Sequence, residues 1–262
     1  MSDEESVGRV VYGLCMDTLP QADTPSEVSQ LTGAPLVQTN DSHRRDFAPV
    51  EQRAVLTPSR NDIAGLPLHE VTFVIVDLET TGATPMNSGI TEIGAVKVRA
   101  GEQISNFRTF CNPGMPIPEF ITEITGITQE HVRLAPEVPA AVQEFLAWAN
   151  LSSTHDTILV AHNAPFDLGF LEQACITHDI QWPEPPVLDT LRLARKLLDR
   201  DEVPNKKLAT LASHFNAPTS PTHRALDDAM ATVTVLHALI ERVAGFGVHD
   251  SAHLLSYEWS AK

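Results

Sequence analysis

Residues 73–82 read FVIVDLETTG. The first four are apolar and three of them are β-branched, which is typical of a strand buried on both faces of a sheet. The apolar run ends abruptly at Asp77, and Glu79 follows two residues later on the same side of the strand. Two carboxylates at the end of a buried strand repel each other unless cations neutralise them. We therefore expect a central sheet with an acidic site at its edge.

The chain on either side of this strand predicts an α/β domain. Residues 93–99 and 105–111 read as strands joined by a turn at 100–102, which predicts an antiparallel meander. A strand is also expected at 157–161, and helices at 139–149, 165–177, 188–198, 206–215 and 223–243. Strands followed by alternating strands and helices indicate a mixed central sheet flanked by helices.

The length of 262 residues, with 42% hydrophobic content, suits one domain with extensions. Residues 1–66 are rich in small and polar residues without a sustained hydrophobic period, so we expect a disordered or weakly structured extension, with a short partner-binding element around residues 7–14. The domain itself is expected at 67–246. Residues 247–262 read as a C-terminal tail.

Targeting and cysteine patterns predict a cytoplasmic protein. No apolar run is long enough for a membrane span, and the acidic start SDEE at residues 2–5 replaces the basic region of a signal peptide. Cys15, Cys111 and Cys175 are odd in number and far apart, which indicates neither a disulfide framework nor a zinc site.

The formal net charge of −16 argues against a protein that holds nucleic acid by its overall field. Residues 67–262 contain 24 acidic and 13 basic residues, a balance of −11. Any chemistry on nucleic acid must therefore rest on a local site, on bound cations, or on a partner that delivers the substrate.

Two further acidic segments could join the first. In HNAPFD, residues 162–167, Asp167 follows a predicted strand and lies near a helix start, where a carboxylate could simply favour the helix N-terminus. In HRALDDA, residues 223–229, His223 and Asp228 are about one and a half helical turns apart. Only a histidine at the helix entry can therefore share a site with Asp228. Asp227 points about 100° away and is expected to be solvated or paired.

These three segments, in this order, resemble the motifs of the DEDDh exonuclease family, which includes the epsilon proofreading subunit of bacterial DNA polymerase III. Its Asp-x-Glu motif is matched by Asp77 and Glu79, its second motif by Asp167, and its His-x4-Asp motif by His223 and Asp228. The resemblance covers about residues 71–243. It implies a ribonuclease H-like fold with a five-stranded mixed sheet.

The resemblance also implies the chemistry. Asp77, Glu79, Asp167 and Asp228 would bind two divalent cations, and hard oxygen ligands select Mg²⁺ or Mn²⁺. Asp77 would bridge both ions, Glu79 and Asp228 would complete the site of the attacking water, and Asp167 would support the second ion. His223 would be the general base. The expected reaction is 3′→5′ hydrolysis of DNA that releases nucleoside 5′-monophosphates.

Substrate contacts are expected from two loops. Thr80, Thr81 and Gly82 could present backbone and hydroxyl groups to the terminal nucleotide, and the ITGIT segment at 124–128 resembles the family's loop near that nucleotide. Thr125, Gly126 and Ile127 are its candidate contacts. Turn chemistry would explain both loops equally well.

The expected substrate is a single-stranded or frayed DNA 3′ end, in proofreading or repair. An RNA-directed 3′ exonuclease is an alternative, because the contacts that read a 2′-hydroxyl cannot be located in the sequence. A non-catalytic replisome accessory module is a second alternative; the intact set of five site residues argues against a role without catalysis. A DNA polymerase subunit as partner and a free-standing repair nuclease are comparably expected.

Overall fold

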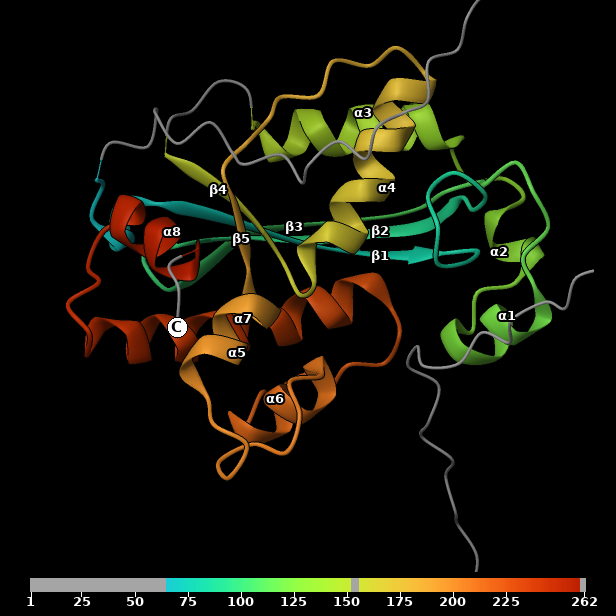
Figure 1. The fold of residues 1–262 in the computed structure, drawn as a ribbon. Helices are drawn as coiled ribbons and strands as arrows, with labels where there is room; N and C mark the ends of the chain where they lie inside the picture. The colour runs from blue at the N-terminus through green and yellow to red at the C-terminus, as the bar shows by residue number, and fades with distance from the viewer. Residues whose placement is uncertain (1–64, 152–155, 260–262) are drawn as a thin grey trace, which may run out of the picture. The chain divides into compact units, whose positions relative to one another are not determined.

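The computed structural model describes residues 65–151 and 156–259. They contain a five-stranded sheet in the order β3-β2-β1-β4-β5 (Figure 1). The strands are β1 Thr72–Thr80, β2 Ile90–Arg99, β3 Glu102–Phe110, β4 Thr157–Ala161 and β5 Val187–Asp189. The first three are antiparallel neighbours, whereas β4 runs parallel to β1, and β5 to β4. The predicted mixed sheet, including its meander, is confirmed.

Helices cover both faces of this sheet. The helices of the described residues are η1 Leu68–Glu70, α1 Glu119–Thr125, α2 Gln129–Val132, α3 Val138–Ala149, α4 Ala164–Thr177, α5 Thr190–Leu197, α6 Leu208–His214, α7 Ala225–Ala244 and α8 Ser251–Trp259. Figure 1 shows α3 and α4 on one side of the sheet and α5, α6 and α7 on the other. A cluster of buried hydrophobic side chains lies on each side. α1 and α2 lie beyond the edge at which β1 ends.

The pleat of β1 determines where its acidic residues point. Phe73 and Ile75 belong to the hydrophobic cluster on the α7 side, whereas Val74 and Val76 belong to the cluster on the α3 and α4 side. Because side chains alternate along a strand, Asp77 and Glu79 continue the row that faces α7. The two carboxylates that follow the apolar part of β1 therefore lie on the α7 side of the sheet, at its edge.

Several element boundaries differ from the sequence prediction, and two of these differences bear on the site. β1 does not end at Asp77, because its antiparallel pairing with β2 continues as far as Thr80 opposite Ile90. Leu188 and Asp189, predicted as the start of a helix, belong to β5, which pairs with β4. The Asp189 side chain then accepts hydrogen bonds from two amides of α5 and caps that helix. A three-residue strand is too short to show its own period.

The C-terminal segment that was expected to be a tail contains α8. Leu254 and Ser251 are fully buried, and the Ser251 amide donates to the Leu66 carbonyl at 2.9 Å. No helix in residues 65–151 and 156–259 combines the length and apolar character needed to cross a membrane. Cys111 and Cys175 are buried free thiols. Residues 1–64 of the expected extension, including the element around residues 7–14 and Cys15, lie outside the described residues.

Candidate active site

The four predicted carboxylates come together from three elements. Asp77 and Glu79 lie on β1, Asp167 lies in the first turn of α4, and Asp228 lies in the first turn of α7. The Leu78 amide, between the two β1 acids, donates to Asp167 Oδ1 at 3.0 Å and so fixes the start of α4 against the strand. Glu79, Asp167 and Asp228 are buried, while Asp77 keeps part of its surface open.

His223 stands at the entry to α7, as the spacing required. Its backbone is left-handed, with φ 57°, a conformation that few residues other than glycine adopt. One ligand atom each of Glu79, His223 and Asp228 lies within 4.8 Å of the other two, and the imidazole is exposed. Asp227 instead accepts a hydrogen bond from the Thr222 hydroxyl at 2.8 Å, while the Thr222 amide donates to Asp228. The two adjacent aspartates therefore have separate surroundings.

The carboxylates raise one another's pKa. Burial raises the pKa of Glu79 to about 8, with further increases from Asp228 and Glu92. Burial also raises the pKa of Asp167 to about 8, although the hydrogen bond from the Leu78 amide acts to lower it. The pKa of Asp77 is raised well above its usual range by burial and then by the charges of Asp167 and Asp228. Without cations, this site retains protons at neutral pH.

The donor set fits divalent cations. The four carboxylates lie close enough to affect one another's pKa, and their mutual repulsion is relieved either by protons or by positive ions. Oxygen donors suit Mg²⁺ and Mn²⁺, whereas no described cysteine lies in this group of residues. Asp77, Glu79, Asp167 and Asp228 are the side chains that would hold such ions.

The raised pKa values predict how stability depends on pH. In a chelator, the unfolded carboxyls lose their protons near their usual values of about 4, whereas Glu79 and Asp167 in the folded protein lose theirs near 8. The contribution of these two carboxyls to the free energy of unfolding is therefore greatest below pH about 4, and it is lost as the pH rises towards 8. Melting curves should show Mn²⁺ stabilising the protein more at pH 8 than at pH 6.

Glu79→Gln is the matched control for this experiment, because it keeps the shape of the side chain and removes one titrating group. The variant should show a shallower decline of melting temperature with pH in chelator. A wild-type profile that coincides with that of Glu79→Gln between pH about 5 and 8 would contradict the raised pKa of Glu79.

A buried ion cluster, which was not predicted from the sequence, supports the entry to α7. Glu92 lies opposite Glu79 in the β1–β2 register and its side chain is completely buried. It accepts hydrogen bonds from Arg108 at 2.7 Å, from Arg224 at 3.0 and 3.1 Å, and from the Ala225 amide at 3.2 Å. Glu92 therefore holds the two residues that directly follow His223.

The surroundings of Glu92 keep it ionised. Burial alone would raise its pKa, but the hydrogen bonds from Arg224, Arg108 and Ala225 outweigh burial and lower the pKa. Nearby, a Cβ added to Gly94 would lie 2.2 Å from backbone atoms of Ala225 and Leu226, so α7 begins directly against β2. The one feature of the sequence that could have indicated this cluster was Glu92 itself, a charged residue within a buried strand.

We expect Glu92→Ala to lower the free energy of unfolding by about 3 kcal/mol. Removing one partner of a buried ion pair usually costs about 3–5 kcal/mol, and the partial exposure of Arg108 and Arg224 places this case at the lower end. Denaturant unfolding measures the change. Glu130→Ala is the control, because Glu130 and Arg133 form an exposed pair that contributes less than about 1 kcal/mol. Equal effects of the two substitutions would contradict this role of Glu92.

The predicted substrate loops are largely occupied with their own turns. The Thr80 hydroxyl donates to the Gly82 carbonyl at 2.7 Å, and the Thr125 hydroxyl donates to the Ile121 carbonyl at 2.9 Å. Ile127 is fully buried. Within these loops, Gly126 borders open space: its φ is 69°, and a Cβ added there would have nothing within 4 Å. Contacts to a nucleotide from these residues would have to be made mainly by backbone groups.

An exposed apolar surface on α1 was not among the predicted contacts. Phe120 and Ile124 are four residues apart, so they share a helix face, and they are 57% and 51% exposed. Such exposure of two large apolar side chains beside an acidic cleft suits contact with unpaired bases, which present apolar faces. In the sequence, two large apolar residues four apart, at and just before the ITGIT segment, were the feature that could have indicated this surface.

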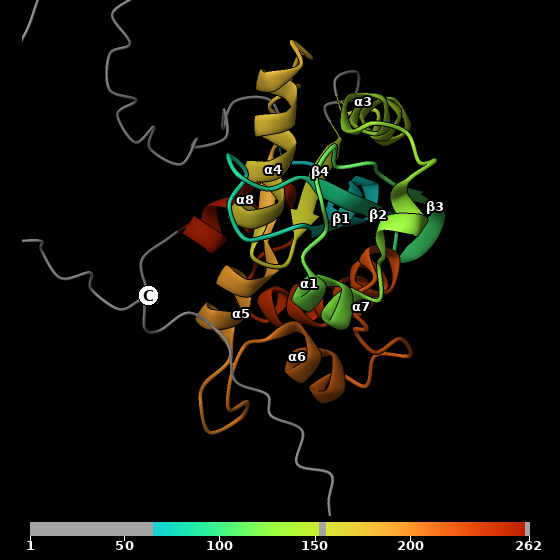
Figure 2. The ribbon, with the colours of Figure 1, turned by 90° about the vertical axis from the view of Figure 1, so that its right-hand side faces the viewer.

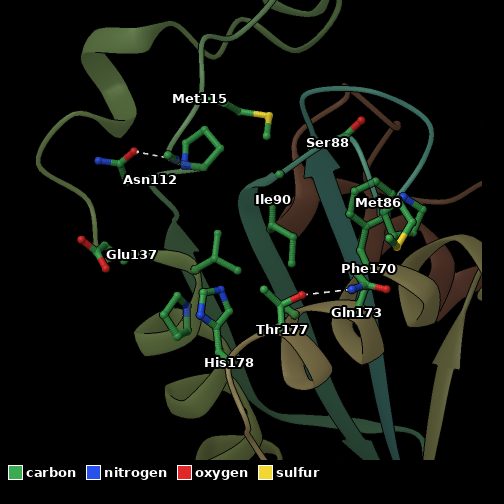
Figure 3. Close-up of a pocket in the computed structure, with 17 residues that line it drawn as sticks. Met86, Ser88, Ile90, Asn112, Met115, Glu137, Phe170, Gln173, Thr177 and His178 are labelled. Carbon is green, nitrogen blue, oxygen red and sulfur yellow. Dashed lines mark hydrogen bonds between the residues drawn. The ribbon is translucent and has the colours of Figure 1, made fainter. Parts of the chain in front are cut away.

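A separate pocket of about 500 Å³ lies on the α3 and α4 side of the 81–89 loop (Figure 3). Met86 and Met115 come from two loops at its rim, and Phe170 and Gln173 come from α4. None of the five motif residues lines this pocket, and neither does any Lys or Arg. It therefore offers no Lys or Arg to a phosphate, and the group of carboxylates remains the candidate active site.

This fold and this cleft define a nuclease of the exonuclease class. The family model described as RNase T exonuclease matches residues 74–236. The chain belongs to this exonuclease family, and its five site residues follow the DEDDh pattern.

Individual relatives agree with this assignment. A Mycobacterium tuberculosis protein, named as a candidate bifunctional exonuclease/endonuclease, is 51% identical over 79% of this chain and 32% of its own length. A DNA polymerase III of the PolC type from Oceanobacillus iheyensis is 41% identical over 67% of this chain and 12% of its own length. The chain thus spans a third or less of these relatives. A solved structure of Exonuclease X with 5′-overhanging duplex DNA is 25% identical, has a TM-score of 0.52, and matches over 71% of this chain and 98% of that one.

Proposed function

We propose that this exonuclease hydrolyses single-stranded or frayed DNA from the 3′ end with two divalent cations, Mg²⁺ or Mn²⁺, and releases nucleoside 5′-monophosphates. The observation that carries the proposal is that Asp77, Glu79, Asp167 and Asp228 come together from three elements, with the exposed His223 beside Glu79 and Asp228. The exonuclease family of the chain, and the duplex DNA bound to the related Exonuclease X, support the choice of substrate.

The chain's own residues have distinct tasks in this reaction. When bound, the two cations stabilise negative charge on the scissile phosphate and on the leaving 3′ oxygen. The four carboxylates hold the cations, and the buried walls of the cleft keep these charges strong. His223 takes the proton from the attacking water and passes it to solvent, which its exposed position allows. Phe120 and Ile124 contact the bases near the terminus.

We place this activity in proofreading or repair of DNA. The PolC-type relative is a DNA polymerase by name, and the matched part is a small segment of that protein. A polymerase that melts a mismatched terminus would deliver the frayed 3′ end to this cleft. Such delivery would also overcome the repulsion between DNA and a protein with a net charge of −16.

The proposal is tested by incubating the protein with strands labelled at the 5′ end, plus Mg²⁺ or Mn²⁺. A ladder of products that shorten by single nucleotides, and that disappears in excess chelator, is the expected result. RNA strands of the same sequence, run in parallel, measure sugar preference. Shortening of a 3′-blocked strand, or full activity in chelator, would rule out a cation-dependent 3′→5′ exonuclease.

A further inference from the structure

Most basic side chains in the described part of the chain are already engaged. Five of its twelve Lys and Arg residues bind carboxylates, namely Arg99, Arg108, Arg133, Arg224 and Arg242. Four more donate to backbone carbonyls, namely Lys97, Arg192, Lys196 and Lys206. Each of these nine cations already has a partner within the protein.

The other three are Arg195, Arg200 and Lys207, whose side chains have no hydrogen-bond or ion-pair partner among the described residues. All three residues are exposed. They lie in α5 and in its connection to α6, and we call them the basic strip. Residues 190–207 contain six basic and three acidic residues, in a chain whose net charge is −16. The unpaired positive charge of the described domain is thus confined to one segment.

The basic strip adjoins the loop that leads to Asp167. The His162 ring forms hydrogen bonds with the Lys206 carbonyl at 3.0 Å and with the Thr190 hydroxyl at 2.9 Å. His162 therefore fixes both the start of α5 and the residue before Lys207. Burial lowers the pKa of His162, while the charge of Asp189 and the hydrogen bond with the Lys206 carbonyl raise it; the charge of Arg195 acts in the same direction as burial.

The segment that carries the strip begins at the catalytic edge of the sheet. The parallel strands β1, β4 and β5 all end at this edge, and α5 begins directly after β5. Figure 2 views the molecule from this side, with α1 in the foreground and α5 and α6 below it and to its left.

We propose that the basic strip binds the phosphodiester backbone of the substrate strand, on the 5′ side of the terminal nucleotide. This inference rests on the proposed function, because it assumes that the strand's 3′ end lies in the carboxylate cleft. Unpaired guanidinium and ammonium groups are the side chains that bind backbone phosphates, independently of base sequence. The carboxylate cleft holds the terminal phosphate, and the strip supplies the attraction that the acidic surface lacks.

The test is binding of a fluorescent single DNA strand of about ten nucleotides, measured by anisotropy with Mn²⁺. All proteins carry Asp77→Asn, which prevents cleavage. Arg195→Gln with Lys207→Gln should raise Kd about three- to tenfold near physiological salt. The slope of log Kd against log salt should fall by about 0.7 for each lost phosphate contact. Arg99→Gln removes one charge at the opposite end of β2 and should leave Kd within about twofold.

A second measurement uses hydrolysis without the Asp77 substitution. The double variant should show a higher KM on the longer strand with an unchanged kcat, and unchanged kinetics on a dinucleotide too short to reach the strip. An unchanged Kd for the longer strand, or an equal loss on the dinucleotide, would overturn the role of the strip. Absence of hydrolysis by the wild-type protein would instead overturn the proposed function, while the binding measurement would still decide on the strip.

Discussion

Asp228→Asn is expected to lower kcat for single-stranded DNA by a factor on the order of 10⁴, as the loss of a single catalytic group does in other hydrolases. Asp228 is buried in the cleft within reach of Glu79 and His223, so its carboxylate contributes directly to cation binding. The substitution keeps the shape of the side chain and its bond from the Thr222 amide, but removes the charge. Single-turnover cleavage at saturating Mn²⁺ measures the effect.

The adjacent residue provides the control. Asp227→Asn also removes one negative charge from the first turn of α7, but Asp227 bonds the Thr222 hydroxyl outside the cleft. Its rate should stay within about twofold of the wild type, as expected for a surface substitution. Asp228→Asn should melt at the same or a higher temperature, because one of several repelling carboxylates has been neutralised. An inactive Asp227→Asn beside an active Asp228→Asn would reverse the assignment of the two aspartates.

The parts of this molecule that follow from local pattern could be predicted from the sequence. β4 has the bounds expected at residues 157–161, and α4 begins one residue before the expected Pro165. A run of apolar residues determines β4, and a proline in the first helical turn determines the start of α4. Such features depend only on residues close together in the sequence. β5 was missed because it consists of three residues whose strand character comes from pairing with β4.

The support of the site could not be predicted, because it depends on partners far apart in the chain. Glu92 meets Arg224 across 132 residues, and Asp167 meets the Leu78 amide across 89. The sequence shows each residue but not the packing that joins them. The same holds for Thr80 and Thr125, whose hydroxyls could equally serve a substrate or a turn, and which the structure shows bonded within their own loops.

The second large effect is expected from His223→Ala, which should lower kcat about 10²–10⁴-fold while leaving Mn²⁺ and DNA affinity nearly unchanged. A side chain that accepts the proton of the attacking water is needed only during the reaction, so its loss falls on kcat rather than on KM.

A competing role for His223 arises from the geometry itself. Its ring lies with Glu79 and Asp228 in a group whose ligand atoms are within 4.8 Å of one another, so the imidazole could bind a cation instead of accepting a proton. The two roles separate on Mn²⁺ titration of the variant. A ligand role predicts weaker Mn²⁺ binding with kcat restored at saturating metal, whereas a base role predicts unchanged Mn²⁺ binding and a kcat that metal does not restore. We expect the second result, because His223 is the exposed member of the group and stands at a left-handed entry to α7, where its ring reaches solvent that can carry the proton away.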